Sequence, residues 1–333
     1  MISAESEVIE RHLDFLRGKS LLLAGAMLDD FLPQLQAQGI QTKAWSWYFH
    51  YTRDKQNAIF SAQFPAAELL PMADLIVFYW SKNKLENQFQ LNQLLAQCQV
   101  GQQVLLVGEN RSGIRSAEKM LAALGELHKS DSARRCSLYH FTLQKVPEFC
   151  FKDFWQQYAL PQLDLTVYSL PGVFSANALD DGSALLLSTI KAPMGDVLDL
   201  GCGAGVIGSF VKKQHPRINL TMSDVHAMAL ESARQTLQQN GLQGEVLASD
   251  VFSEINQKFD LILSNPPFHD GRDTAYQAVT TLIEQAKWKL KSGGELRIVA
   301  NSHLPYPELL NRHFGNYQIL AQTNKFKVYS VRN

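Results

Sequence analysis

The chain has few cysteines and no strong excess of charge of either sign. Its four cysteines form no C-x-x-C pair and have no zinc-type spacing with histidine, which argues against a structural zinc site or a disulfide framework. The formal net charge is −1, so a nucleic-acid partner would be held by a local basic surface rather than by the overall charge. We therefore expect reduced thiols and no bound metal.

Long apolar runs are also missing. No run approaches the roughly 18 apolar residues that a membrane-spanning helix requires. The first residues carry acids where a secretory signal carries bases, namely Glu5, Glu7, Glu10 and Asp14. We expect a cytoplasmic protein with no membrane partner. Its 333 residues are enough for two domains with separate cores.

Short apolar segments alternate with longer polar ones along the chain. In the first half the apolar runs lie at residues 20–25, 74–79, 104–107 and 137–141, after a predicted helix at 6–16. This alternation is typical of βα units on a mainly parallel sheet. The aromatic, irregular stretch around 147–170 is predicted to connect two domains, which we place at residues 1–160 and 161–333.

The second half repeats the order of the first. Leu21–Gly25 matches Val197–Gly201 at an offset of 176, and Ala73–Phe78 matches Phe259–Ser264 at an offset of 186. We infer two copies of one α/β unit, although two unrelated α/β domains would look similar at this level. The first copy lacks the polar residues of the second, with Leu23 in the place of Asp199. It is therefore predicted to be degenerate and to bind no cofactor.

A glycine-rich turn follows the first apolar run of the second copy. Gly201, Gly203 and Gly205 would let a ligand approach the backbone more closely than any Cβ atom permits. Asp199 lies two residues before the first of these glycines, where it would bind a cation such as an amino group. Close packing of a helix is the alternative explanation for the glycines.

Two further acids follow the next apolar runs. Asp224 lies about twenty residues past the glycines, where a carboxylate binds ribose hydroxyls in nucleotide-binding folds. It could instead cap a helix predicted at residues 227–239. Asp250, in the run 246–252, is placed to accept from an adenine amino group, or it is a solvated turn residue.

The run Phe259–Leu263 ends at the stretch Asn265-Pro266-Pro267-Phe268. Proline has no backbone donor and cannot continue a central strand, so the chain must leave the sheet there. An amide, a rigid loop and an aromatic ring thus follow a strand, at the edge where open α/β sheets bind ligands. A proline strand terminator with a core phenylalanine is the alternative.

These motifs, in this order, resemble the class I S-adenosylmethionine-dependent methyltransferases. Over nearly the whole chain they are similar to the bacterial 16S rRNA guanine-N2 methyltransferases of the RsmC type. The resemblance is carried further by the segments Leu170–Ser175, Leu179–Ser183, Asn265–Gly271 and Gly294–Asn301. It implies two tandem Rossmann-like α/β domains, S-adenosylmethionine as cofactor and the small ribosomal subunit as partner. We expect the chain to act as a monomer.

The resemblance also implies roles for single residues. Phe174 and Ser183 would close over the methionine end of the cofactor, and Asn265 would also contact it. The Asn265 side-chain oxygen and the Pro266 carbonyl would accept from the guanine amine while Phe268 stacks on the base. We expect His269 to orient the loop or contact RNA rather than act as a general base.

Other readings of the sequence remain open at this point. A large-subunit (23S) rRNA guanine-N2 methyltransferase would share the motifs, a protein glutamine-N5 methyltransferase usually has Tyr at position 268, and a binding module would need no cofactor. Exposed bases could contact phosphate, or they could belong to solvated helix faces. They are Arg111, Arg115, Lys119, Arg134 and Arg135 in the first half, and Lys287, Lys289, Lys291, Lys325 and Lys327 in the second.

Overall fold

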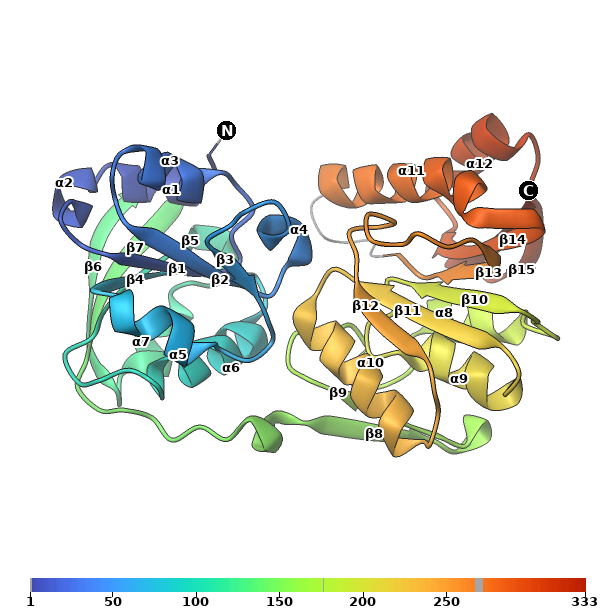
Figure 1. Ribbon diagram of the computed structural model, residues 1–333, viewed down its shortest axis with the longest axis horizontal. Helices are drawn as coiled ribbons and strands as arrows, with labels where there is room; N and C mark the ends of the chain where they lie inside the picture. The colour runs from blue at the N-terminus through green and yellow to red at the C-terminus, as the bar shows by residue number, and fades with distance from the viewer. Residues whose placement is uncertain (1, 176, 267–271) are drawn as a thin grey trace. The chain divides into compact units, whose positions relative to one another are not determined.

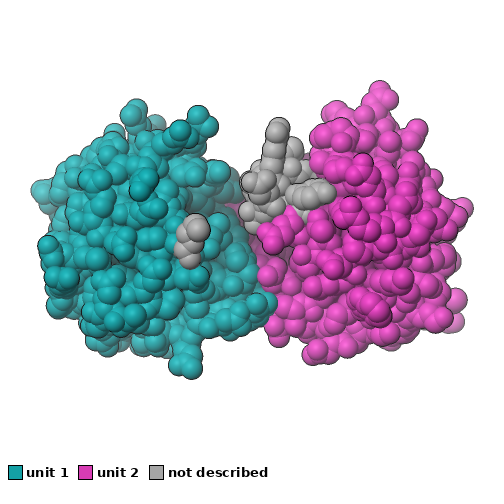
Figure 2. Space-filling model, turned by 90° about the horizontal axis from the view of Figure 1, so that it is seen from above, with its two compact units in different colours: residues 1–155 teal, residues 156–333 magenta. Residues whose placement is uncertain are grey.

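A computed structural model describes residues 2–175, 177–266 and 272–333, with only the backbone described for 272–276. The chain divides into two compact units, an amino-terminal unit (Met1–Trp155) and a carboxy-terminal unit (Gln156–Asn333), which Figure 2 colours separately. Each unit contains a mixed β-sheet flanked by helices (Figure 1). The α/β class predicted from the sequence is confirmed.

The sheet of the carboxy-terminal unit has the strand order β12-β11-β10-β13-β14-β16-β15. Neighbouring strands from β12 to β14 are parallel, and β16 is antiparallel to both β14 and β15. The strands are β10 (Asp196–Leu200), β11 (Asn219–Asp224), β12 (Glu245–Ala248), β13 (Phe259–Ser264), β14 (Leu290–Asn301), β15 (Gln318–Gln322) and β16 (Phe326–Arg332).

Helices cover both faces of this sheet (Figure 1). Alternate residues of a strand point to opposite faces, so Ile262 joins the core under α11 and α12 while Leu261 and Leu263 join the core under α8, α9 and α10. Burial on both faces explains why the strands read as continuous apolar runs. The helices are α8 (Asp181–Ser188), α9 (Val206–Gln214), α10 (Ala227–Gln239), α11 (Arg272–Lys289) and α12 (Tyr306–Phe314), and a hairpin of β8 (Gln156–Leu160) and β9 (Leu165–Ser169) precedes them.

The amino-terminal unit has the equivalent strand order, β3-β2-β1-β4-β5-β7-β6. Its strands are β1 (Leu21–Gly25), β2 (Thr42–Ser46), β3 (Ala58–Phe60), β4 (Leu75–Tyr79), β5 (Gln103–Glu109), β6 (Gly125–Ala133) and β7 (Cys136–Leu143). Its helices are α1 (Ala4–Glu10), α2 (Leu13–Leu16), α3 (Phe31–Ala37), α4 (Phe49–Thr52), α5 (Ala66–Leu69), α6 (Lys84–Leu95) and α7 (Ser116–Leu121).

Strand register supports the internal repeat. Leu21 of β1 lies opposite Leu75 of β4, and Val197 of β10 lies opposite Leu261 of β13. These are the residue pairs that the offsets of 176 and 186 relate to one another. The two units therefore share not only their strand order but also the register between their central strands.

An equivalent hydrogen bond at the amino ends of these strands in each unit also supports the internal repeat. The Asp74 carboxylate accepts from the Ser20 backbone N–H at 2.8 Å. In the second unit the Asp260 carboxylate accepts from the Asp196 backbone N–H at 2.7 Å. The same acid thus joins the same two strands in each copy.

Two elements differ from the sequence prediction. The helix expected at residues 6–16 is interrupted between α1 and α2, where Arg11 and His12 both contact the Asp131 carboxylate of β6. The strand that was expected to end with Asp250 ends instead at Ala248, where the Ser249 hydroxyl accepts from the Glu254 N–H and closes a turn. In both places side-chain contacts compete with regular backbone structure.

Candidate active site

The ends of three central strands meet at one edge of the carboxy-terminal sheet. Leu200 of β10 lies opposite Ser223 of β11 on one side and Ser264 of β13 on the other. The glycine-rich turn, Asp224 and Asn265 follow directly after these positions. Parallel pairing therefore brings together residues that are up to 65 positions apart in the chain.

Asp199 on β10 is fully buried. Its Oδ2 accepts from the Gly208 N–H of α9 at 2.8 Å, whereas its Oδ1 is buried with no hydrogen-bond partner among the described residues. Burial raises the pKa of this carboxyl to about 7; the nearby Asp224 charge adds to the rise and the Gly208 N–H opposes it. An unsatisfied buried acceptor of this kind fits a cationic ligand.

The glycines of the turn differ in what would surround a Cβ atom at each position. Gly201 and Gly203 have φ angles of +73° and +53°, and a Cβ at Gly201 would meet nothing within 4 Å. The positive φ angle favours glycine at both positions, and the open space beside Gly201 leaves room for a ligand. At Gly205 φ is +77° and a Cβ would lie 3.0 Å from the Ala233 Cα of α10, so backbone conformation and close helix packing both account for this glycine. A cofactor role for Gly205 stays a prediction.

Asp224, at the end of β11, holds the glycine-rich turn. Its Oδ2 accepts from the Gly203 N–H at 2.9 Å and its Oδ1 accepts from the His226 N–H at 3.0 Å. Burial raises the pKa of this carboxyl, and the Gly203 N–H opposes the rise. Asp224 is not the N-cap of α10, because that position belongs to His226.

Asp250 lies in the turn after β12, two residues beyond Ala248, which pairs with Asp224. Its backbone N–H donates to the Ser253 Oγ at 3.1 Å. The residue is therefore at the same edge of the sheet as Asp224. Its predicted contact with adenine stays a prediction.

Asn265 follows β13 with its side-chain amide in a fixed orientation. Its Nδ2 donates to the Asp180 Oδ1 at 3.1 Å and to the Ser183 Oγ at 2.9 Å. Since a carboxylate can only accept, the NH₂ group must face Asp180. The Asn265 Oδ1 is buried and has no hydrogen-bond partner within the described parts of the chain.

The segment before α8 completes this arrangement. The Asp180 Oδ1 also accepts from the Gly182 and Ser183 N–H groups, at 3.0 Å each, and its Oδ2 accepts from the Ser175 hydroxyl at 3.2 Å. Sequence reasoning did not single out Asp180. The available signal was an aspartate just before an apolar helical run, which is typical of an N-cap.

The remaining predicted site residues differ in their exposure and in whether the structure describes them. Pro266 is buried, and the Phe174 side chain is 60% exposed. The Phe174 carbonyl oxygen lies 3.8 Å from the position of a Cβ built on Gly203, so this loop runs over the glycine-rich turn. Phe268 and His269 lie outside the described residues.

The amino-terminal unit carries different groups at the equivalent positions. Leu23 and Met27 are buried in the places of Asp199 and Gly203. Tyr79, in the place of Asn265, is buried with its hydroxyl 2.9 Å from the Ser6 Oγ of α1. Apolar side chains and a phenol thus occupy positions that hold carboxylate, backbone and amide groups in the other copy.

Two negative findings concern the described residues alone. They include no helix that combines the length and apolar character needed to cross a membrane. They also include no group of three or more His, Cys, Asp and Glu side chains arranged to hold a metal ion.

Comparison with known proteins gives consistent matches over the whole chain. Residues 164–330 match the methyltransferase small domain family, and residues 6–158 match its N-terminal domain family. The chain is 62% identical to the ribosomal RNA small subunit methyltransferase C of Haemophilus influenzae strain 86-028NP, over 100% of both chains. It is 62% identical to the protein of the same name from Mannheimia succiniciproducens, over 99% of both.

A solved structure matches both units together. It is the T. thermophilus 16S rRNA N2 G1207 methyltransferase (RsmC) in complex with AdoMet and guanosine, with a TM-score of 0.83. The match covers 99% of this chain and 92% of that chain at 21% sequence identity. At this identity the likeness shows a common fold.

Proposed function

The chain belongs to the ribosomal RNA small subunit methyltransferase C family, and from this membership and its site geometry we propose its reaction. It transfers a methyl group from S-adenosylmethionine to the exocyclic N2 amine of a guanine in 16S rRNA. The observation that carries the proposal is the Asn265 Oδ1, a buried acceptor held open at the carboxyl edge of the sheet. The family resemblance read from the sequence is confirmed.

The target nitrogen explains why an acceptor is needed. The lone pair of the guanine amine is delocalised into the ring, which makes the amine a weak nucleophile. The Asn265 Oδ1 would accept one N–H and the Pro266 carbonyl the other, and these bonds would localise the lone pair on nitrogen. Methyl transfer then depends mainly on placement, with reacting atoms about 3–3.5 Å apart.

The residues at the edge fit S-adenosylmethionine. When bound, it supplies a methyl group on a positively charged sulfur, which keeps the C–S electron pair as the new N–C bond forms. The methylated nitrogen would then lose one proton to water. The open Asp199 Oδ1 would accept from its amino group, and the backbone at Gly201 and Gly203 would lie against it. Asp224 would bind the ribose hydroxyls and Asp250 the adenine amine.

Three further residues complete the proposed site. Phe174 and Ser183 would close over the methionine end of the cofactor, and Asn265 would lie between cofactor and base. Phe268 would stack on the guanine. A base inside a helix cannot reach such a site, so the target guanine would be single-stranded or flipped out of its stack.

The amino-terminal domain is proposed to support the fold and to bind RNA without a cofactor. Its β6–β7 turn consists of Arg134 and Arg135, with φ angles of +51° and +62°. The Arg135 carbonyl accepts from the Asn110 N–H at 2.8 Å, which places Arg111 next to the turn. These exposed guanidinium groups would contact phosphate. We propose that the enzyme acts in the cytoplasm as a monomer.

Labelled S-adenosylmethionine tests the reaction directly. The enzyme is incubated with small ribosomal subunits from cells that lack it, and the RNA is digested to nucleosides. We expect label in N2-methylguanosine from 16S rRNA. Label only in 23S rRNA, or in a glutamine side chain of a protein, would instead identify one of the two related methyltransferase classes.

A further inference from the structure

The carboxylate of Asp180 joins three parts of the active site. Its Oδ1 accepts from two backbone N–H groups at the start of α8 and from the Asn265 Nδ2. Its Oδ2 accepts from the Ser175 hydroxyl in the preceding loop. One side chain therefore caps the helix, holds the loop and contacts the amide on which the proposed reaction depends.

An asparagine amide has two orientations of nearly the same shape, related by a half-turn. With the NH₂ group outward, Asn265 would present a donor to the guanine amine, which is also a donor. The other orientation presents the Oδ1 acceptor. A neighbour that presents only an acceptor to the amide enforces the second orientation, and the Asp180 carboxylate is such a neighbour.

Ser183 cannot set this orientation alone. Its hydroxyl lies 2.9 Å from the Asn265 Nδ2, but a hydroxyl can either donate or accept. With Asp180 as a strict acceptor, both Nδ2 hydrogens are used within the protein. The Oδ1 then remains as the amide atom that has no hydrogen-bond partner among the residues the structure describes.

We propose that Asp180 is a positioning residue that fixes the Asn265 amide with its Oδ1 toward the substrate amine. This inference rests on the proposed function. It concerns the orientation of the Asn265 Oδ1, since Asp180 acts through Asn265 and does not itself touch the guanine.

The amino-terminal unit provides an internal comparison for the cap of α8. Helix α1 precedes β1 as α8 precedes β10, and its N-cap is Ser3, whose hydroxyl accepts from the Ser6 N–H at 3.2 Å. Three residues after that cap, Ser6 contacts Tyr79, as Ser183 contacts Asn265. A phenol hydroxyl can both donate and accept, so Tyr79 needs no neighbour to fix its orientation. In that copy the N-cap residue is the shorter serine. The aspartate cap occurs in the copy that has an amide to orient.

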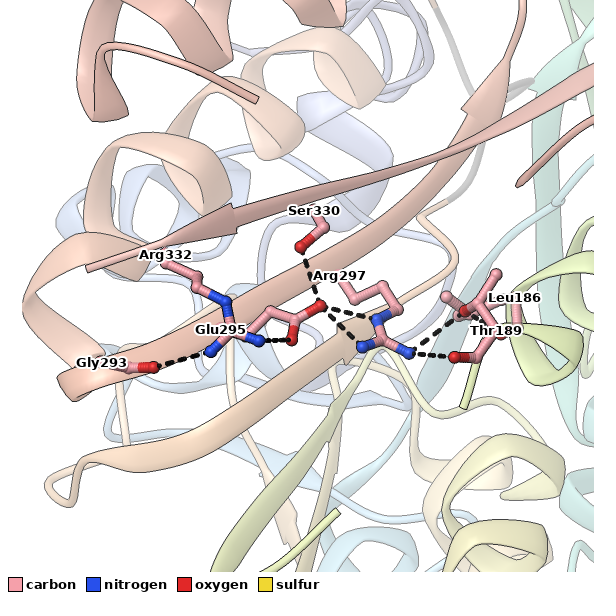
Figure 3. Close-up of polar contacts among 7 residues, drawn as sticks. All are labelled: Leu186, Thr189, Gly293, Glu295, Arg297, Ser330 and Arg332. Carbon is pink, nitrogen blue, oxygen red and sulfur yellow. Dashed lines mark hydrogen bonds and ion pairs between the residues drawn. The ribbon is translucent and has the colours of Figure 1, made fainter. Parts of the chain in front are cut away.

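Helix α8 is also held at its other end, as Figure 3 shows. Arg297 of β14 donates to the carbonyl of the C-cap residue Thr189 at 2.7 Å and pairs with Glu295 at 2.7 Å. The helix is thereby tied to the central sheet. Asp180 consequently presents its carboxylate from an anchored element rather than from a free loop.

Two substitutions separate the orientation of the Asn265 amide from the capping of α8, because serine and asparagine both cap helices well. Asp180→Ser keeps a cap but is too short to reach Asn265, and we expect kcat to fall at least about tenfold. Asp180→Asn should keep an acceptor oxygen toward Asn265, because the Gly182 and Ser183 N–H groups donate to the atom in that place, so kcat should fall no more than about threefold. In both variants the Kd for S-adenosylmethionine and the KM for the ribosomal subunit should change less than about twofold.

A double-mutant cycle provides the second readout. If Asp180 acts through Asn265, then Asp180→Ser should cause no further loss of kcat in an Asn265→Ala background. Losses that multiply would show a merely structural role and overturn the proposal, as would an unchanged kcat in Asp180→Ser. Should Asp180→Ser fail to fold by thermal unfolding, Asp180→Thr serves as the short cap in the same cycle.

The unmodified enzyme separates this inference from the proposed function. If it methylates N2 of guanine and the cycle shows independent effects, only the positioning role fails. If it forms no N2-methylguanosine, the proposed function fails whatever the variants do.

Discussion

At the scale of single residues, the site is marked by acceptor atoms that lack protein partners. Leaving a buried acceptor unsatisfied typically costs about 1–3 kcal/mol. Asp199 and Asn265 each present such an atom at the same edge of the sheet, within the described part of the chain. A donor group bound at either atom would recover that cost. We therefore place the cofactor amino group at the Asp199 Oδ1 and the guanine amine at the Asn265 Oδ1.

Replacement of Asn265 by alanine should separate binding from reaction. We expect single-turnover methyl transfer to fall by about 10²-fold or more, because the variant has no acceptor for the amine in the transition state. The Kd for S-adenosylmethionine, measured by calorimetry, should change less than about threefold. Tyr79→Phe, at the equivalent position of the other copy, is the matched control and should leave both values unchanged. Equal losses of binding and transfer would mean that Asn265 only supports the loop.

The raised pKa of Asp199 gives a pH dependence with a defined sign. Its pKa is about 7 in the folded protein, against an ordinary value of 3.8 for an aspartate in water, so the folded state holds this proton more tightly. The contribution of Asp199 to stability is therefore present at low pH and is lost as pH rises from about 4 to about 7. Burial also raises the pKa of the neighbouring Cys202 well above its usual value, so this thiol stays neutral over the same range.

The measurement is a comparison of Asp199→Asn with the unmodified protein by denaturant unfolding without cofactor. We expect the variant to gain stability relative to the unmodified protein as pH rises from about 4 to about 7, because asparagine cannot ionise. Its affinity for S-adenosylmethionine should fall most above that range, where the carboxylate of the unmodified protein is charged. A stability difference that is independent of pH would contradict the assigned shift.

The sequence was sufficient to place together those candidate site residues that lie at the end of a strand. Asp199, Asp224 and Asn265 each lie at the end of an apolar run, and parallel pairing then brings them together. Asp180 could not be found in this way. Its contact with Asn265 joins residues 85 positions apart, and only tertiary packing of α8 against the sheet brings them within hydrogen-bond distance.

At the scale of elements, a polar network anchors α8 to β14 and β16 (Figure 3). The Glu295 and Arg297 side chains are only 9% and 12% exposed, and Ser330 donates to the same Glu295 oxygen at 2.8 Å. Arg332 pairs with the other oxygen at 3.1 Å but is 69% exposed. Burial makes the inner arginine the more important partner, since its loss would leave the buried Glu295 carboxylate with only the exposed Arg332 as a cationic partner.

Substitution of the two arginines should therefore give unequal results. We expect Arg297→Ala to lower the free energy of unfolding by about 3 kcal/mol, because it leaves the Glu295 charge buried. The matched variant Arg332→Ala should lower it by about 1 kcal/mol or less, since that pair is exposed to solvent. Denaturant unfolding measures both values. Equal effects would show that burial does not govern this network.

The boundaries of elements were predictable where one interaction dominated. The helix at 227–239 has the bounds expected from its pattern. The strand before Asp250 was predicted too long, because a serine hydroxyl there competes with the sheet for backbone donors. The break between α1 and α2 depends on Asp131, which lies more than a hundred residues away. Local sequence carries no signal for such a distant partner.

At the scale of the whole molecule, one topology is present twice with different chemistry. Both sheets have equivalent strand order, and the acids Asp74 and Asp260 make the same strand-joining bond in each. Among the described residues, only the carboxy-terminal copy has carboxylate and amide groups at the equivalent positions along the carboxyl edge of its sheet. The fold was therefore readable from patterns shared by the copies, and the candidate site from the positions at which they differ.

The arginine turn provides a test of the amino-terminal unit. We expect Arg135→Glu combined with Arg111→Glu to weaken binding of the small subunit, and to lower the salt dependence of binding by about one unit of slope for each phosphate that is no longer neutralised. Arg17→Glu, an exposed position before β1 at the opposite edge of the sheet, is the matched control. Filter binding over a range of salt concentrations measures both. An unchanged slope in the double variant would remove this turn from the RNA surface.

The most direct test of the central claim is a crystal structure of the enzyme with S-adenosylhomocysteine and guanosine. We expect the Asn265 Oδ1 to accept from the guanine N2 amine at about 2.8–3.0 Å, with the NH₂ group still facing Asp180. A guanosine bound away from Asn265, or an Asn265 amide turned with its NH₂ toward the base, would contradict the account.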